Sequence, residues 1–144
     1  MPLRTTPDRA SEHPVLTLVL PWLAVLIWAS LIYLFSSLPS LSTGLGAWDL
    51  IIRKIAHMGE FTILATLLWS AIGNLGYRLL LALPVACVLA LLYAVSDEYH
   101  QQFVPGRNGS ARDVVIDAAG ITMAVFAILC VKSRNSGKSG GKSR

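Results

Sequence analysis

The sequence predicts an all-α membrane protein, a polytopic bundle of four antiparallel transmembrane helices. Of its 144 residues, 54% are hydrophobic and only 14% are charged. A soluble domain of this size could not cover its surface with so few polar groups. The apolar residues also form four long blocks. Each block is close to the roughly 20 residues that a helix needs to cross the hydrocarbon core of a membrane.

The first two helices are predicted over residues 15–35 and 51–75. The first block holds no charge. It is too long for the apolar core of a signal peptide and no small-residue cleavage site follows it, so we interpret it as a retained helix. The second block carries its charged residues in its first turns and is uncharged from Phe61 to Leu75. Lipid admits only helices or closed barrels, and these blocks have the length of helices.

The remaining two helices are predicted over residues 79–96 and 113–131, with Pro21 and Pro84 as expected kinks. Residues 15–131 therefore form one four-helix membrane domain. Residues 1–14 are predicted to be a cytoplasmic N-terminal segment. Residues 132–144 are rich in serine, glycine and basic residues, a composition typical of a disordered tail. We expect no nucleic-acid partner, because basic residues beside a final hydrophobic helix are better explained by membrane orientation.

Both termini are predicted to lie in the cytoplasm. Eight of the 12 lysine and arginine residues fall in the two terminal segments and the connection 73–78, which share one side of the membrane. Basic residues favour the cytoplasmic side. The start of the second helix, the end of the third and the start of the fourth then meet at the extracytoplasmic face. Polar residues far apart in the sequence are therefore predicted to converge on one pocket.

The polar residues of the second helix recur at helical spacing. Lys54, His57 and Glu60 stand at positions i, i+3 and i+6 and span about 120° of the helix surface, so all three can face the bundle interior. A structural alternative is a first helical turn at headgroup level, with Lys54 extended toward water.

The end of the third helix carries two adjacent carboxylates. Asp97 shares a face with His100 and Gln101, whereas Glu98 points elsewhere. Two desolvated neighbouring carboxylates cannot both be ionised cheaply, so partners are expected. The alternative is an ion-pair network that only closes the end of the bundle.

A tight turn over residues 105–109 is predicted by its proline and glycines. It returns Arg107 to the membrane surface, where a guanidinium can bind a phosphate or a carboxylate. Ser110 and Asp113 fit a capping box. An alternative to ligand binding is therefore that Asp113 only stabilises the start of the helix. Asp117 lies one turn deeper, inside the apolar block, and Gly120 and Ala124 continue a seam of small residues suited to close helix packing.

The common motifs for nucleotide binding and for nucleophilic catalysis are absent from the sequence. His57, Glu60, Asp97, Glu98 and His100 are chemically able to bind a metal, but their spacing is not diagnostic, so we assign no metal and no cofactor. Ten residues are predicted to bind a ligand: Lys54, His57, Asp97, Glu98, His100, Gln101, Arg107, Arg112, Asp113 and Asp117.

Three stretches of sequence resemble the VanZ-like membrane proteins. They are Lys54-Ile-Ala-His57, the run from Ser96 to Arg107, and Asp113-x-x-x-Asp117-x-x-Gly120. Ser36-Ser-Leu-Pro39 is similar to the opening motif of that family, and the resemblance covers roughly residues 28–129. It implies a small helical protein of the cell envelope, and the namesake is associated with low-level resistance to the glycopeptide teicoplanin.

The leading functional hypothesis is an envelope protein whose extracytoplasmic pocket binds an anionic or zwitterionic headgroup. Membrane lipids, or a lipid-linked or glycopeptide-related ligand, are the expected partners, and glycopeptide tolerance is the expected consequence. One alternative is a membrane-embedded enzyme acting on a lipid or polyprenyl substrate, with Glu98 or His100 as the acid/base group or metal ligand. The other is a helper subunit whose polar network only fixes helix packing.

Overall fold

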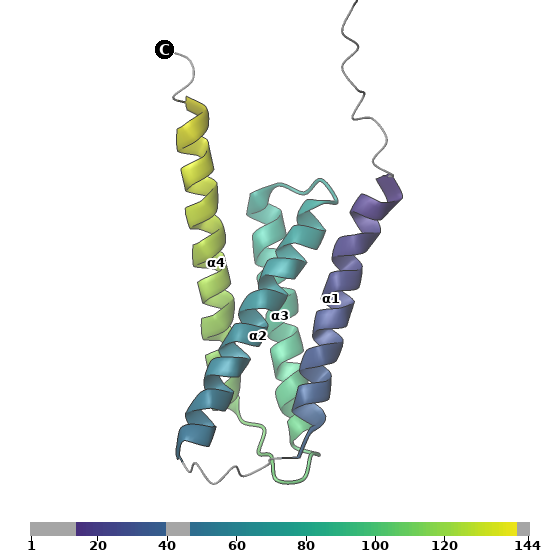
Figure 1. Cartoon of the computed structure of the whole chain (residues 1–144), viewed down its shortest axis with the longest axis vertical. Helices are drawn as coiled ribbons and strands as arrows, with labels where there is room; N and C mark the ends of the chain where they lie inside the picture. The colour runs from purple at the N-terminus through teal and green to yellow at the C-terminus, as the bar shows by residue number, and fades with distance from the viewer. Residues whose placement is uncertain (1–13, 40–46, 141–144) are drawn as a thin grey trace, which may run out of the picture.

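The computed structural model describes residues 14–39 and 47–140. Within these ranges it contains four helices and no strand (Figure 1). The helices are α1 (Pro14–Ser37), α2 (Ala47–Gly73), α3 (Leu79–Gln101) and α4 (Ala111–Gly140). Each is long and apolar enough to cross a membrane. The prediction of an all-α, four-span bundle is confirmed.

The helices run antiparallel in sequence order, and α2 and α3 lie between α1 and α4 (Figure 1). α2 contacts all three other helices, whereas α1 and α4 do not touch each other within the described residues. The end of α1 and the start of α2 lie at the same end of the bundle as the loop between α3 and α4. That end is called the polar end below.

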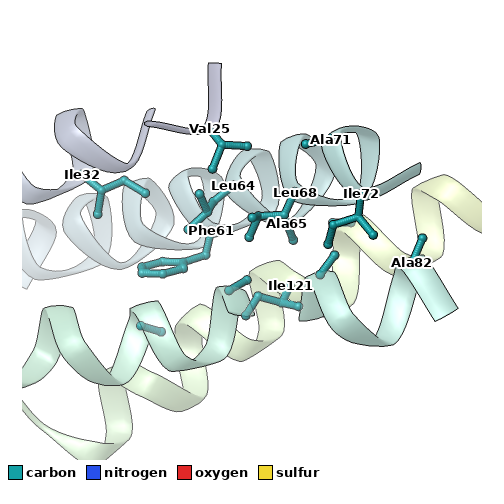
Figure 2. Close-up of a cluster of buried hydrophobic side chains, with 14 residues drawn as sticks. Val25, Ile32, Phe61, Leu64, Ala65, Leu68, Ala71, Ile72, Ala82 and Ile121 are labelled. Carbon is teal, nitrogen blue, oxygen red and sulfur yellow. The ribbon is translucent and has the colours of Figure 1, made fainter. Parts of the chain in front are cut away.

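Small side chains on α3 allow the helices to pack closely. Ala82, Ala86, Ala90 and Ala94 recur at every fourth residue and are at most 1% exposed. This spacing places them on one face of the helix, and small residues let helix backbones approach each other in a membrane. Figure 2 shows the larger side chains of the same cluster, most of them contributed by α2 between residues 61 and 72.

The outer surface of the bundle is apolar. Leu80, Val115 and Phe126 are 83%, 68% and 71% exposed. A soluble monomer rarely exposes contiguous apolar patches of this extent, so these side chains face lipid. The described chain is a multi-pass membrane protein; the side on which its termini lie stays a prediction.

All four helices are longer than the sequence predicts, and α3 and α4 extend furthest beyond their predicted ends. α3 continues five residues past 96, so the polar residues from Asp97 to Gln101 lie in its last turns. α4 runs to Gly140, although residues 132–144 were expected to be disordered. Six of the nine residues from 132 to 140 are serine, asparagine or glycine, which have low helix propensity, so the local sequence does not explain this extension. Residues 1–13 and 141–144, which hold the rest of the predicted terminal segments, lie outside the described residues.

Candidate functional site

A cavity of about 380 Å³ lies at the polar end. This volume is within the range of small-molecule sites in proteins. Residues of α2, α3, α4 and the loop 102–110 line the cavity, which makes it the meeting point of the segments that were predicted to converge. The lining residues are Asp49, Leu50, Arg53, Lys54, His57, Glu98, Gln101, Gly106, Arg107, Asn108, Asp113 and Ile116.

An ion pair between Lys54 and Asp113 joins α2 to α4 on the cavity wall. Lys54 Nζ lies 2.5 Å from Asp113 Oδ1, and the two side chains are 34% and 30% exposed. Pairs with this access to water contribute only about 0–1 kcal/mol to stability. The ammonium group has three donors, so Lys54 can contact a further group while it remains paired with Asp113.

Half of the predicted capping box forms at the start of α4, and Glu98 of α3 supplies the other half. The backbone N–H of Asp113 donates to Ser110 Oγ at 3.3 Å, and Ser110 Oγ donates to Asp113 Oδ2 at 3.0 Å. The backbone N–H of Ser110 donates to Glu98 Oε2 at 2.8 Å. Glu98 thus takes the place that the fourth residue of a capping box usually occupies, and the start of α4 is held against the end of α3.

Asp97 anchors α1 to α3. Its Oδ2 atom accepts a hydrogen bond from Ser36 Oγ at 2.7 Å and another from Gln101 Nε2 at 2.8 Å. All three residues are buried. Hydrogen bonds to a charged acceptor are about twice as strong as neutral ones, so this triad is a firm contact between the two helices.

Arg107 holds the turn over residues 105–109 against the end of α1. Its guanidinium donates to the carbonyl oxygens of Phe35 at 2.8 Å and Leu38 at 3.0 Å. Gly106 has a φ of 76°, which confirms the predicted tight turn. Burial, and to a lesser extent nearby Arg53, lower the pKa of Arg107, but an arginine stays charged in proteins. Its positive charge lies at the negative end of the α1 dipole.

His57, Glu98 and Asp117 form a buried cluster beside the cavity. Each offers one potential ligand atom, and these atoms lie within 4.8 Å of one another. His57 Nδ1 is 3.3 Å from Asp117 Oδ1. Asp117 is completely buried and Glu98 is 4% exposed. Three different helices therefore bring one imidazole and two carboxylates to one point.

Four of the ten predicted ligand residues do not line this cavity. Asp117 lies beside it in the cluster described above, and Asp97 borders a second cavity. His100 borders the same second cavity, where its ring centroid is 4.6 Å from that of Tyr33 and its Nε2 atom is 3.1 Å from Ser37 Oγ. Arg112 is exposed and does not line either cavity at the polar end. Of the two residues considered for catalysis, only Glu98 borders the larger cavity.

A family model supplies the comparison that decides the classification. The model of the VanZ/LLP1 family matches residues 10–132, which include the first three membrane spans completely and most of the fourth. The chain belongs to the VanZ/LLP1 family. Comparisons with curated proteins and with solved structures give no significant match.

The motifs that resembled the VanZ-like proteins meet at the polar end. Ser36 of the opening motif bonds to Asp97 of the central motif. Arg107, the last residue of the central motif, bonds to the chain just before Pro39. The motifs of this VanZ/LLP1 protein therefore contact each other directly.

Four contributors to this end were missing from the predicted site. Ser36 belonged to a recognised motif but was not assigned a partner. Arg53 precedes Lys54 directly, and its charge at the start of an apolar helix was the available signal. Asp49 and Asn108 carry no comparable signal, because polar residues are ordinary in a first helical turn and in a turn.

Proposed function

We propose that this VanZ/LLP1 membrane protein binds the phosphate-bearing headgroup of a membrane lipid or lipid-linked envelope precursor in the cavity at its polar end. The observation that carries the proposal is the set of three cationic residues on the cavity wall, Arg53, Lys54 and Arg107. Guanidinium and ammonium groups are the usual protein ligands of phosphate.

The position of the cavity suits a lipid. It lies where four membrane spans end or begin, which is the level of lipid headgroups in a bilayer. Leu50 lines the cavity and is also 59% exposed. The wall of the cavity therefore continues into the lipid-facing surface, along which the acyl or polyprenyl chain of the ligand would lie.

The balance of charge in the cavity wall favours one class of headgroup. Three acidic residues, Asp49, Glu98 and Asp113, line the cavity together with the three cations. A strongly anionic ligand would find no net attraction in such a wall, whereas a phosphodiester with hydroxyl or amine groups can use both signs. Headgroups of the ethanolamine, glycerol or sugar type are thus favoured over a bare phosphate.

Lys54→Gln is expected to lower the affinity for phosphatidylethanolamine about tenfold, the value of one charge-assisted hydrogen bond of about 1.4 kcal/mol. Native mass spectrometry of the purified protein, titrated with this lipid, measures the change. Diacylglycerol with the same acyl chains tests whether phosphate is needed. Arg78→Gln is the matched control, because it removes the same charge from the connection at the opposite end of the bundle. Equal affinities of the two variants, or equal binding of diacylglycerol, would contradict the proposal.

Glycopeptide tolerance, if it depends on this cavity, should fall with the same substitution. Cells that express wild-type protein are expected to show higher teicoplanin tolerance than cells that express Lys54→Gln at equal membrane levels. Arg107→Ala is a poorer probe, because Arg107 also holds the end of α1. Equal teicoplanin tolerance of the two strains would show that headgroup binding through Lys54 plays no part in resistance.

An enzyme acting on the same lipid is the second candidate. The observation that favours it is the buried cluster of His57, Glu98 and Asp117, two of whose residues border the cavity. A carboxylate or an imidazole in such a place can serve as a general base. If the lipid has the same mass after incubation with the protein, the protein only binds it. If the lipid loses its headgroup with wild-type protein but not with Glu98→Gln, the protein turns it over.

A further inference from the structure

We propose that His57, Glu98 and Asp117 bind one divalent transition-metal ion. Each residue comes from a different helix, α2, α3 and α4 respectively. Metal sites in helical bundles are built in this way, from histidine and carboxylate side chains on facing helices. The ligand atoms of all three residues lie within 4.8 Å of one another.

The atoms that face each other in this cluster are incompletely paired. Among the described residues, none donates a hydrogen bond to Glu98 Oε1 or to Asp117 Oδ2. His57 Nδ1 lies 3.3 Å from Asp117 Oδ1, a distance that makes an ion pair only when the imidazole is protonated. Asp117 has no exposed surface and Glu98 is 4% exposed. A buried polar group without a partner costs about 1–3 kcal/mol, and more when it is charged, so the two unpaired carboxylate oxygens beside this pair indicate a missing ligand.

The charge of the cluster identifies a cation as that ligand. Two ionised carboxylates beside a neutral imidazole carry two negative charges inside a membrane span. Protonation of His57 cancels only one of them. A divalent ion cancels both and also supplies a partner for every unpaired atom. Buried charges are tolerated when they are paired or coordinate a metal.

The ligand set favours a transition metal over Mg²⁺ or Ca²⁺. Imidazole nitrogen suits Zn²⁺ and other transition metals, whereas Mg²⁺ and Ca²⁺ prefer oxygen ligands alone. Zinc lies about 2.0–2.2 Å from nitrogen and carboxylate ligands, which places tetrahedral ligand atoms about 3.4 Å apart. Bringing atoms that are within 4.8 Å to this separation requires small side-chain rotations.

Neighbouring contacts fix the three ligands in place. Glu98 uses Oε2 for the backbone of Ser110, which leaves Oε1 directed to the cluster. Met58, which follows His57, lies directly against Gly120, one turn after Asp117. The backbones of α2 and α4 are therefore held together beside the two ligands. Such supporting contacts orient the ligands of protein metal sites.

The ion would border the proposed headgroup cavity, since His57 and Glu98 line it. With three protein ligands, a tetrahedral ion keeps one position open, as in catalytic zinc sites. In so far as the proposed function holds, that position would accept a phosphate oxygen and would turn a wall of balanced charge into a positive one. The metal site itself does not depend on lipid binding.

The test is the metal content of the full-length protein in detergent. After removal of metal with a chelator, the protein is incubated with Zn²⁺ or Mn²⁺, passed through a desalting column and measured by elemental mass spectrometry. We expect about one ion of at least one of these metals per chain, a higher melting temperature with that metal than without it, and no such effect of Mg²⁺. A content near zero with both metals would overturn the proposal.

Substitutions that nearly keep the size of the three side chains distinguish a loss of metal binding from a loss of folding. His57→Gln, Glu98→Gln and Asp117→Asn are each expected to weaken metal binding about 100-fold or more and to abolish the metal-dependent rise in melting temperature. Asp117→Asn should remain about as stable as metal-free wild type, because it keeps the size of the side chain and removes one of two neighbouring buried negative charges. His100→Gln and Glu60→Gln, which alter the same residue types outside the cluster, should bind as wild type does. Unchanged metal binding by Asp117→Asn would overturn the proposal, even if the lipid affinity measured with Lys54→Gln behaves as expected.

Discussion

Replacing Gly120 by alanine is expected to lower the free energy of unfolding by about 3 kcal/mol, the upper end of what overpacking costs. A Cβ atom at this position would meet the backbone carbonyl of Met58 on α2. Backbone atoms cannot move aside as a flexible side chain can, so α4 has to shift away from α2. The shift also stretches the 2.8 Å hydrogen bond from Thr62 Oγ1 to the carbonyl oxygen of Gly120. Unfolding in detergent, followed by circular dichroism, measures the loss.

Gly59→Ala is the matched control for this prediction. Gly59 also lies inside a helix, α2, but nothing lies within 4 Å of a Cβ atom built there. Alanine at an open helical position is expected to stabilise the protein by about 0.5–1 kcal/mol. The two substitutions add the same methyl group, so opposite signs isolate the close approach of α2 and α4. Equal effects at the two glycines would show that this approach is not tight.

Asp97→Ala is expected to cost about 3 kcal/mol, because it removes two hydrogen bonds to a charged acceptor and leaves a buried donor without its partner. The two bonds come from Ser36 and Gln101. Gln101 keeps its 3.1 Å hydrogen bond to Ser36 Oγ, so the hydroxyl of Ser36 is the donor that loses its acceptor. Asp97→Asn keeps one acceptor oxygen and should cost less than half as much. Thermal unfolding of the three proteins in the same detergent gives this order.

Serine substitutions test the same anchor from α1. Ser36→Ala is expected to cost about 1–2 kcal/mol, because Ser36 donates to Asp97. Ser30→Ala is expected to be neutral within about 0.5 kcal/mol, because its exposed hydroxyl donates to the carbonyl oxygen of Leu26 in its own helix and, among the described residues, to no other helix. If both serines behave alike, the contact between Ser36 and Asp97 does not hold α1.

The sequence was sufficient for those features that depend on one segment at a time. Apolar blocks of about 20 residues predicted the four spans, and the spacing of Ser110 and Asp113 predicted the cap. Helix count and alternation of direction then predicted that the polar segments share one end. These inferences need only the length of a helix and the cost of a charge in lipid.

Contacts between segments were harder to predict. Asp97 and His100 share a face of α3 and both contact α1, through Ser36 and Tyr33, whereas Glu98 between them faces Ser110. The 100° turn per residue predicts that Glu98 points away from the other two, but it does not say which helix lies in each direction. The sequence likewise could not show that His57 and Asp117, on helices separated by α3 in the chain, come within 3.3 Å.

The polar cluster also constrains the biogenesis of the protein. Its three residues are made in the order His57, Glu98, Asp117, so α4 is the last of the three helices to leave the ribosome. Until it arrives, the first two residues face each other without their third member. An ionised Asp117 without partners is costly in lipid, so α4 is expected to insert more readily once α2 and α3 offer it a polar surface. Insertion of α4 is therefore the step that completes the cluster, and a chain halted before it would hold an open, half-built polar site.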